Sequence, residues 1–362
     1  MRATRGRDMT VSTISTAAPA EPPNPNTLPM FRAAYSDRTS ALMAQLAGIA
    51  YDTTPYEDPK TRLDIRPIPK TWIPAPPSLK ALGFDEVMYF FNQRVDGWAY
   101  VAVSDAMIVL SFRGTQSLKN WGTNLGALLV PVFGSAATKH LLIHKGFYDA
   151  YQDMHADDAH FEAVFREAML ARPNTPAFIT GHSLGGALAQ IGAARLEVVV
   201  DQGAHDLPSP PSDRIAACYT YGSPKVGNKY FDLWVKSPSY RVVDYADIVP
   251  MVPFWWPYQH SGDPRYLPNV VKASPFRYGP TVLLNLWHIL IALPLLATGE
   301  ILGIADHMPP MYIGKLETIV GFRTSASRAR SATGRRGGHD APPSADDFSA
   351  KKPSDPPAPP NG

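Results

Sequence analysis

The sequence Gly181-His182-Ser183-Leu184-Gly185 holds a serine between two glycines, with an apolar stretch before it and small residues after it. We interpret it as a strand, a tight turn and a helix, because glycine at both flanking positions lets the chain turn sharply and leaves the serine hydroxyl at the tip. The N–H groups at the start of that helix would face the same point and stabilise negative charge. The pattern predicts a nucleophilic serine at position 183.

A serine hydroxyl is a weak nucleophile at neutral pH and needs a base, usually a histidine that a carboxylate holds in one tautomer. After a strand–turn–helix of this kind, the acid comes next along the chain and the histidine follows it. Asp247 comes directly after a predicted strand that ends at Tyr245, where a loop carboxylate would reach the serine. Asp244 is the alternative, but it lies inside that strand and would need a bulge. We favour Asp247, although a turn-capping aspartate before Pro250 would fit the same sequence.

Five histidines follow Ser183, and two of them are candidates for the base. The other three are excluded by their positions. His205 precedes both candidate acids, His288 lies inside an apolar run, and His339 lies in the C-terminal stretch that we expect to be disordered. His307 precedes Pro309-Pro310 and a predicted terminal helix over 311–319, and proline favours the first turn of a helix. A histidine on a loop before the last helix is what this arrangement requires, so we favour His307. His260, which comes soon after Asp247, remains the alternative.

The reaction also needs N–H donors for the negative oxygen that forms when an ester carbonyl is attacked. One donor is predicted to be the backbone N–H of Leu184, the residue after the nucleophile. A second should come from a loop after an early strand, and Arg113-Gly114-Thr115 follows such a strand. Gly114 would allow the turn, and Thr115 would supply its N–H and its hydroxyl. Losing one such donor typically costs about 3–4 kcal/mol of transition-state stabilisation.

Alternating strands and helices are predicted around these residues. Strands are expected over 87–93, 98–104, 107–112, 215–221 and 240–245, and helices over 36–51 and from Asp157 onward. Strand–helix alternation after residue 140 favours a mostly parallel sheet with helices on both faces, which is an α/β fold. We expect one domain over residues 31–323. Residues 1–30 and 324–362 are polar and rich in proline or alanine, and we expect them to be disordered.

The composition narrows the function. The formal net charge is +2 and the aromatic residues are not interleaved with Lys/Arg clusters, so nothing indicates a nucleic-acid partner. The single cysteine, Cys218, cannot form an intramolecular disulfide. The N-terminal residues lack the apolar core of a standard secretory signal, so we expect a cytoplasmic protein or one exported without a cleaved leader. We expect a monomer that needs no metal or cofactor.

An apolar insertion at about 280–300 contains the run 282–297, which is interrupted by Asn285, His288 and Pro294. It is short for a bilayer span of about 20 residues and carries polar groups within it. We expect a buried helix, with a cap that touches substrate or membrane as the second interpretation and a transmembrane helix as the third.

Several motifs occur in an order that resembles the class 3 lipases, the family of the fungal-type triacylglycerol lipases. They are Phe112–Thr115, Asn120-Trp121, His144–Tyr151, Gly181–Gly186, Tyr219–Asn228 and Asp247–Pro250, and the resemblance covers roughly residues 40–320. It implies an α/β-hydrolase fold with Ser183 as nucleophile, Asp247 as orienting acid and His307 as base, the last within an Asp306-His307…Tyr312 pattern. It also implies that Thr115 and Leu184 are the oxyanion donors and that His260 is not catalytic.

In that family the segment after the first oxyanion residue is a mobile lid, which here corresponds to about 116–140. Its apolar residues would form a face too large to leave in water, and glycines beside them would let the segment bend; the residues are Trp121, Leu125, Leu128 and Leu129. A fixed helix packed on the sheet is the alternative. The aromatic residues after the acid, Phe254, Trp255 and Trp256, would line an acyl pocket or fill the core.

Together these features predict a serine carboxylic ester hydrolase that acts on acylglycerols or other lipid esters at an interface, with peripheral contact to a membrane. A phospholipase A1 or a soluble-ester, feruloyl-type esterase is the alternative within the enzymes. A lipid-binding protein that keeps the fold without the chemistry is the alternative outside them.

Overall fold

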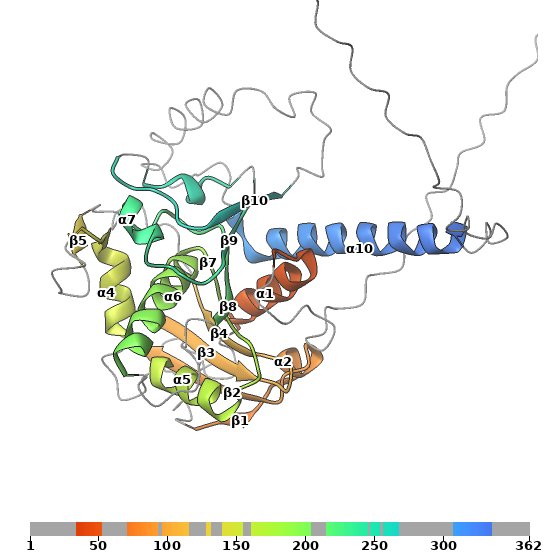
Figure 1. The fold of residues 1–362 in the computed structure, drawn as a ribbon, viewed down its shortest axis with the longest axis horizontal. Helices are drawn as coiled ribbons and strands as arrows, with labels where there is room; N and C mark the ends of the chain where they lie inside the picture. The colour runs from red at the N-terminus through yellow and green to blue at the C-terminus, as the bar shows by residue number, and fades with distance from the viewer. Residues whose placement is uncertain are drawn as a thin grey trace, which may run out of the picture. The chain divides into compact units, whose positions relative to one another are not determined.

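The computed structural model describes residues 34–52, 71–92, 96–115, 128–131, 140–154, 161–203, 215–244, 247–253, 256–267 and 307–334 (Figure 1). The chain divides after Val320 into two units, Met1–Val320 and Gly321–Gly362. The sheet, the helices that cover it and the candidate site belong to the first unit. Of the second unit, only the helical residues 321–334 are described.

The core of the first unit is an eight-stranded sheet with the order β1-β2-β3-β4-β7-β8-β9-β10. Its strands are β1 (Ile73–Pro74), β2 (Glu86–Asn92), β3 (Gly97–Val103), β4 (Ile108–Phe112), β7 (Ala177–His182), β8 (Ile215–Tyr221), β9 (Ser239–Asp244) and β10 (Asp263–Leu267). The strands from β1 to β4 pair antiparallel, and the strands from β4 to β10 pair parallel. The predicted α/β fold with a mostly parallel sheet is confirmed.

Four parallel neighbours bring the chemistry-bearing residues to one edge of the sheet. β4, β7, β8 and β9 all run in the same direction, so their carboxyl ends meet. The residues that leave these ends are the loop Arg113–Thr115, Ser183, Gly222 and Asp247. Open α/β sheets bind ligands outside the carboxyl ends of their strands.

Helices cover both faces of the sheet, as the strand–helix alternation predicts (Figure 1). One face packs against α4 (Lys145–Asp153), α5 (Phe161–Ala171) and α6 (Leu184–Gly203), and the other against α1 (Asp37–Ile49), α2 (Pro77–Ala81) and the start of α10 (Pro309–Gly334). Neighbouring residues of one strand serve different faces: Leu110 belongs to the first core and Val109 to the second. This alternation is what a strand buried on both sides requires.

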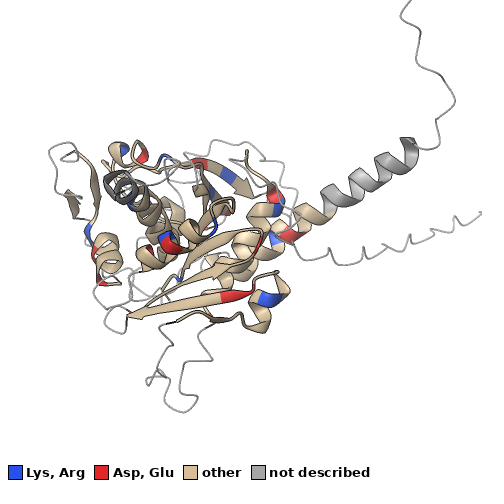
Figure 2. Cartoon of the chain, turned by 60° about the horizontal axis from the view of Figure 1, so that its bottom comes forward, with Lys and Arg blue, Asp and Glu red and all other residues tan. Residues whose placement is uncertain are grey.

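Charged side chains lie mostly away from the central strands. In the view of Figure 2, acidic and basic residues are interspersed over the helices and loops, while the middle of the sheet carries few of either. A sheet covered on both faces by helices has little room for unpaired charge.

The helices begin where local sequence favours them. α1 follows Ser36, whose side chain accepts a hydrogen bond from the N–H of Thr39 at 3.4 Å and so caps the helix. α10 opens on Pro309-Pro310, in accord with the predicted helix at 311–319, but it continues to Gly334. It therefore extends past residue 324, where we expected a disordered tail to begin, through a stretch whose Ala and Arg residues are good helix formers.

A second, two-stranded sheet joins β5 (Leu129–Pro131) to β6 (Leu142–His144) in antiparallel register. Within the expected lid at 116–140, only residues 128–131 and His140 are described, and residues 129–131 form β5. The mobile lid and the fixed helix therefore lie mostly outside the described residues, as does the apolar insertion 280–300. In the part of the chain that is described, no helix combines the length and the apolar character needed to cross a membrane.

Candidate active site

The strand–turn–helix predicted around Ser183 is present: β7 ends at His182, and α6 begins at Leu184. Ser183 has a φ of 59°, a left-handed conformation that is rare for a non-glycine residue and typical of strained functional turns. Both flanking glycines are required. A Cβ atom at Gly181 would lie 2.1 Å from the carbonyl oxygen of Gly185, and one at Gly185 would lie 2.3 Å from the carbonyl oxygen of Phe112.

The loop after β4 packs directly against this turn. A Cβ atom at Gly114 would lie 2.6 Å from the carbonyl oxygen of His182 and 3.1 Å from the Cβ of Ser183. Thr115, the next residue, therefore lies at the same end of the sheet as the nucleophile and the first residue of α6, Leu184. The structure brings the two predicted oxyanion donors to one place, and their role as donors stays a prediction.

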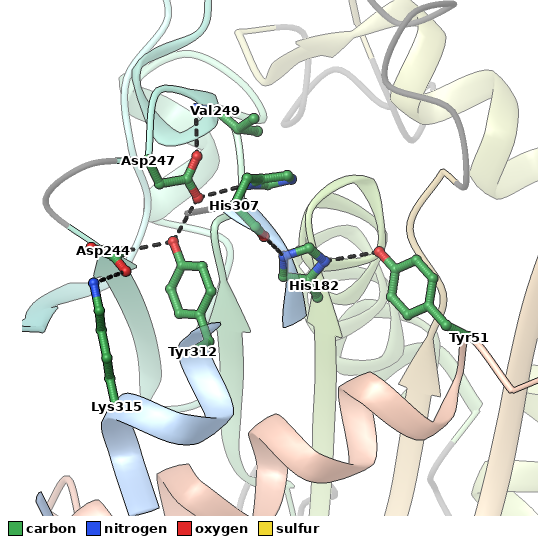
Figure 3. A network of polar contacts seen from close by, with 8 residues as sticks. All are labelled: Tyr51, His182, Asp244, Asp247, Val249, His307, Tyr312 and Lys315. Atoms are coloured by element: carbon green, nitrogen blue, oxygen red, sulfur yellow. Dashed lines mark hydrogen bonds and ion pairs between the residues drawn. The ribbon is translucent and has the colours of Figure 1, made fainter. Parts of the chain in front are cut away.

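Asp247 and His307 form a buried pair, as Figure 3 shows. The Nδ1 atom of His307 lies 2.7 Å from Oδ2 of Asp247, with side-chain exposures of 2% and 0%. Asp247 is held further by the hydroxyl of Tyr312, which donates to Oδ2 at 2.6 Å, and by the N–H of Val249, which donates to Oδ1 at 2.9 Å. The carboxylate is fixed from three directions.

This arrangement sets the tautomer of His307. Because a carboxylate accepts hydrogen bonds, Nδ1 carries the proton in the neutral ring and Nε2 has the free lone pair. Nε2 of His307 and Oγ of Ser183 are both buried, and neither has a hydrogen-bond partner among the described residues. These are the two atoms that a triad would join, and such bonds are often long before substrate binds.

Asp244, the alternative acid, has a different environment. It is the last residue of β9, and its carboxylate forms a buried ion pair with Lys315 of α10. Its backbone N–H donates to the hydroxyl of Tyr312 at 3.0 Å. The structure thus brings His307 to Asp247 and uses Asp244 to anchor the helix that follows His307.

His260, the alternative base, has a different electrostatic environment from that of a typical general base. Burial lowers the pKa of its imidazole to about 3, helped by the positive charges of Arg241 and Lys225. A group with so low a pKa is a poor acceptor for the serine proton at neutral pH. The excluded candidates His205, His288 and His339 lie outside the described residues.

Sequence reasoning missed the roles of Tyr312, which holds the acid Asp247, and of Lys315, which holds the neighbouring Asp244. The two residues are three apart on α10 and therefore share one helix face, which is the signal that was available. Burial, together with the charge of Asp247, raises the pKa of the Tyr312 phenol well above its ordinary value, so its hydroxyl stays protonated and donates.

Gly222 was also missed. It follows β8 with a φ of 57°, and a Cβ atom there would lie 2.7 Å from Oδ2 of Asp247 and 2.9 Å from Nδ1 of His307. Only glycine allows the chain to pass this close to the pair.

His182, the residue before the nucleophile, lies between two further groups. The hydroxyl of Tyr51 is 2.8 Å from its Nδ1, and its Nε2 is 2.5 Å from the backbone carbonyl oxygen of His307 (Figure 3). Burial lowers the pKa of His182 well below its usual value, and the nearby His307 lowers it further. His182 is therefore neutral at neutral pH.

The remaining predicted residues are only partly described. Trp121, Leu125, Phe254 and Trp255 lie outside the described residues. Leu129 is partly buried, whereas Leu128 is 61% exposed and Trp256 is 84% exposed, so Trp256 does not fill the core. An apolar cavity of about 580 Å³ lies between the ends of α1 and α2 and the start of α10, beside Tyr51 and Met308.

Comparison with known sequences gives one family. The family model described as lipase (class 3) matches residues 109–256. The chain is 35% identical over 177 residues to a secreted mono- and diacylglycerol lipase of Fusarium solani, an alignment that covers 46% of each. It is 30% identical over 168 residues to a lipase of Rhizomucor miehei, covering 45% of this chain and 42% of that one. The chain thus spans less than half the length of these two relatives.

Solved structures give the same fold. Lipase II of Rhizopus niveus superimposes with a TM-score of 0.50 at 25% identity, covering 64% of this chain and 80% of that one. The triacylglyceride lipase of Rhizomucor miehei gives a TM-score of 0.51 at 25% identity, covering 66% and 83%. A triacylglycerol lipase described as having a serine protease triad at its catalytic centre gives 0.50 at 26% identity, covering 68% and 84%.

Proposed function

We propose that this chain, whose resemblance to the class 3 lipases is confirmed and which has their α/β-hydrolase fold, is a serine carboxylic ester hydrolase. The observation that carries the proposal is the buried Asp247–His307 pair at the same end of the sheet as a strained, glycine-flanked Ser183. A lone Gly-x-Ser-x-Gly turn would fit a structural role. A histidine oriented by a carboxylate, whose Nε2 has no hydrogen-bond partner among the described residues and which lies at the same end of the sheet, fits a catalytic one.

The proposed reaction proceeds through an acyl-enzyme. Oγ of Ser183 attacks the ester carbonyl carbon while Nε2 of His307 takes the hydroxyl proton, and Asp247 stays ionised and stabilises the imidazolium. The carbonyl oxygen becomes negative and accepts hydrogen bonds from the N–H groups of Leu184 and Thr115. The intermediate collapses, His307 passes its proton to the departing alcohol oxygen, and the acyl group remains on Ser183. Water then repeats these steps and releases the carboxylic acid.

The substrate class in this proposal is a lipid ester, with an acylglycerol as the main candidate. The relatives of known name support it, since they include lipases for mono-, di- and triacylglycerols. Exposed apolar side chains near the site support it as well: Met308, directly after the base, is 48% exposed. The proposal includes contact with a lipid interface through such side chains and a lid over part of 116–140. It also includes a monomeric state, and a cytoplasmic location or export without a cleaved leader.

Labelling with a fluorophosphonate tests the chemistry. The reagent reacts only with an activated serine, so the peptide that contains Ser183 should gain the adduct in the wild type and not in Ser183→Ala. Ser104→Ala is a matched control, because Ser104 is also a buried serine but lies in the β3–β4 turn at the other end of β4. A folded wild type that takes no label would overturn the hydrolase proposal and favour a lipid-binding protein.

The base and the substrate need separate measurements. His307→Ala should abolish turnover while His260→Ala retains most of it, and the reverse would contradict the assignment.

A series of p-nitrophenyl esters and emulsified acylglycerols of increasing chain length tests the substrate. Faster cleavage of acetate than of long-chain esters, with no gain above the solubility limit, would indicate a soluble-ester esterase. Cleavage confined to phospholipid would indicate a phospholipase A1.

A further inference from the structure

His182 connects two parts of the site that are far apart in the sequence. Its Nδ1 contacts the hydroxyl of Tyr51 at the end of α1, and its Nε2 contacts the backbone carbonyl of His307, as Figure 3 shows. The proposed reaction assigns no role to either Tyr51 or the His182 ring. The His182 ring lies directly beside the base, with ring centroids of His182 and His307 4.6 Å apart, and the Tyr51 ring is 5.8 Å from the His182 ring.

The directions of these bonds follow from the chemistry of the partners. A backbone carbonyl only accepts, so Nε2 of His182 carries the proton and donates to His307. In a neutral imidazole the other nitrogen is then an acceptor, so the Tyr51 hydroxyl donates to Nδ1. The two hydrogen bonds therefore point the same way: Tyr51 donates to His182, and His182 donates to the backbone carbonyl of His307.

The same hydroxyl also reaches the oxyanion loop. It lies against the backbone of Gly114, where an added Cβ atom would be only 2.2 Å from the hydroxyl oxygen. The contacts therefore run from Gly114 through Tyr51 and His182 to the backbone of His307, the first by packing and the other two by hydrogen bonds. They connect the loop that carries Thr115, the turn that carries Ser183 and the segment that carries the base.

We propose that Tyr51 and His182 are positioning residues: their two hydrogen bonds, and the packing of the Tyr51 hydroxyl against Gly114, fix the positions of the oxyanion loop and of the His307 backbone relative to Ser183. The inference rests on the proposed function. In the proposed reaction neither Tyr51 nor His182 touches the substrate carbonyl. A base anchored to the residue next to the nucleophile keeps its distance to that nucleophile, and a displacement of about 1 Å in such a site costs on the order of a hundredfold in rate.

Charge supports the same role. His307 becomes positive when it takes the serine proton, and a second positive imidazole with its ring centroid 4.6 Å away would oppose that step. His182 is kept neutral by its burial and by this neighbour, and so it can hold His307 without repelling it.

Tyr51→Phe removes the hydroxyl and keeps the ring. We expect kcat on p-nitrophenyl butyrate to fall by about tenfold to a hundredfold with KM nearly unchanged, and fluorophosphonate labelling to slow in parallel. Tyr100→Phe is the matched control. Its hydroxyl also makes one buried bond, to the carbonyl of Leu46 at 2.7 Å, but Tyr100 lies within β3, away from the reacting groups. It should lower the melting temperature and leave kcat unchanged.

Two variants of His182 separate the two bonds. His182→Gln places an amide N–H near the position of Nε2 and should keep the bond to His307, whereas His182→Asn places an amide oxygen near Nδ1 and should keep the bond from Tyr51. Tyr51→Phe should slow His182→Asn further but add little to His182→Gln, because His182→Gln has already lost the Tyr51 bond.

Three outcomes would overturn the inference: kcat of Tyr51→Phe within twofold of wild type, a fall in kcat matched by an equal fall in the folded fraction measured by circular dichroism, or independent, multiplying effects of Tyr51→Phe and His182→Gln. Failure of the proposed function is a different result. It would appear as a folded wild type without turnover or label on Ser183, whereas failure of the inference leaves an active wild type.

Discussion

The two halves of the site are built differently. The acid half consists of Asp247, Asp244, Tyr312 and Lys315, and its carboxylates are held by a histidine, a phenol, an ammonium group and a backbone N–H. The nucleophile half consists of Oγ of Ser183 and Nε2 of His307, two buried atoms without hydrogen-bond partners among the described residues. The polar groups of the acid half are thus hydrogen-bonded, and the two reacting atoms of the nucleophile half are not.

The difference follows from what each half must do. The acid must keep one orientation through the whole reaction, and hydrogen bonds to a buried carboxylate provide that while offsetting its desolvation. In the proposed reaction the serine hydroxyl gives its proton to the imidazole nitrogen and the serine oxygen forms a covalent bond to the carbonyl carbon, so stable partners would compete with the reaction. We therefore expect substitutions in the nucleophile half to cost activity and substitutions in the acid half to cost stability as well.

Ser183→Ala should have the largest effect and fall on activity alone. Loss of the nucleophile should lower kcat by about a millionfold, or about 8 kcal/mol of transition-state stabilisation. The free energy of unfolding should change by less than about 0.5 kcal/mol, because the hydroxyl has no partner among the described residues. Turnover assays and urea denaturation measure the two quantities. A large loss of stability would mean that the two halves do not differ as described.

Asp247→Asn should affect both quantities. An amide can donate to Nδ1 and so favour the wrong tautomer of His307, which should lower kcat by about ten-thousandfold, or about 5 kcal/mol. The free energy of unfolding should fall by about 1–3 kcal/mol, since the Asp247 carboxylate accepts several buried hydrogen bonds. Asp263→Asn on the exposed β10 is the control, and it should leave both values near wild type. Unchanged stability in Asp247→Asn would contradict the comparison.

Lys315→Met should act mainly on stability. It removes the cation of a buried ion pair with Asp244, which typically costs about 3–5 kcal/mol. Activity per folded molecule should fall by less than tenfold, because Lys315 does not contact Asp247 or His307 directly. Chemical denaturation of Lys315→Met, and of the same variant with Asp244→Asn added, measures this. The second substitution should recover part of the loss, and a further loss would show that Asp244 is held mainly by other groups.

Tyr312→Phe should have the smallest effect of the four. It removes one donor to Asp247 and one acceptor for the N–H of Asp244, which should cost about 1–3 kcal/mol of unfolding free energy. We expect kcat to fall by about tenfold or less, since His307 and Val249 still hold the carboxylate. Tyr230→Phe, on a ring that is 39% exposed, is the control. A loss of kcat as large as that of Asp247→Asn would place Tyr312 in the chemistry itself.

Local sequence predicts the nucleophile half well and the acid half only in part. The turn at Ser183 is set by two glycines and an apolar strand, all within a few residues. The strand ends near Asp247 and the start of α10 follow from patterning and proline. The spacing of Tyr312 and Lys315 places them on one helix face, but their contacts, like those of His182, depend on where α10 and α1 pack against the sheet.

Two strands show another limit. β10 (Asp263–Leu267) was not predicted, because it is a polar edge strand with exposed residues and a proline at its second position. β5 pairs with β6 through only three residues, too few to show a period. Apolar periodicity identifies strands that are buried, and it gives no signal for a polar strand at the edge of a sheet.

Because Asp247 is held by a residue of α10, the site is completed late in the synthesis of the chain. The turn at Ser183 can form as soon as β7, α6 and their neighbours have been synthesised, but Asp247 is held in place only after His307 and Tyr312 exist. At about 5–20 residues per second, the ribosome needs on the order of ten seconds to make the chain between them. During that interval the growing chain has the serine turn without an oriented base, so under the proposed function ester hydrolysis would begin only when α10 has packed against the sheet.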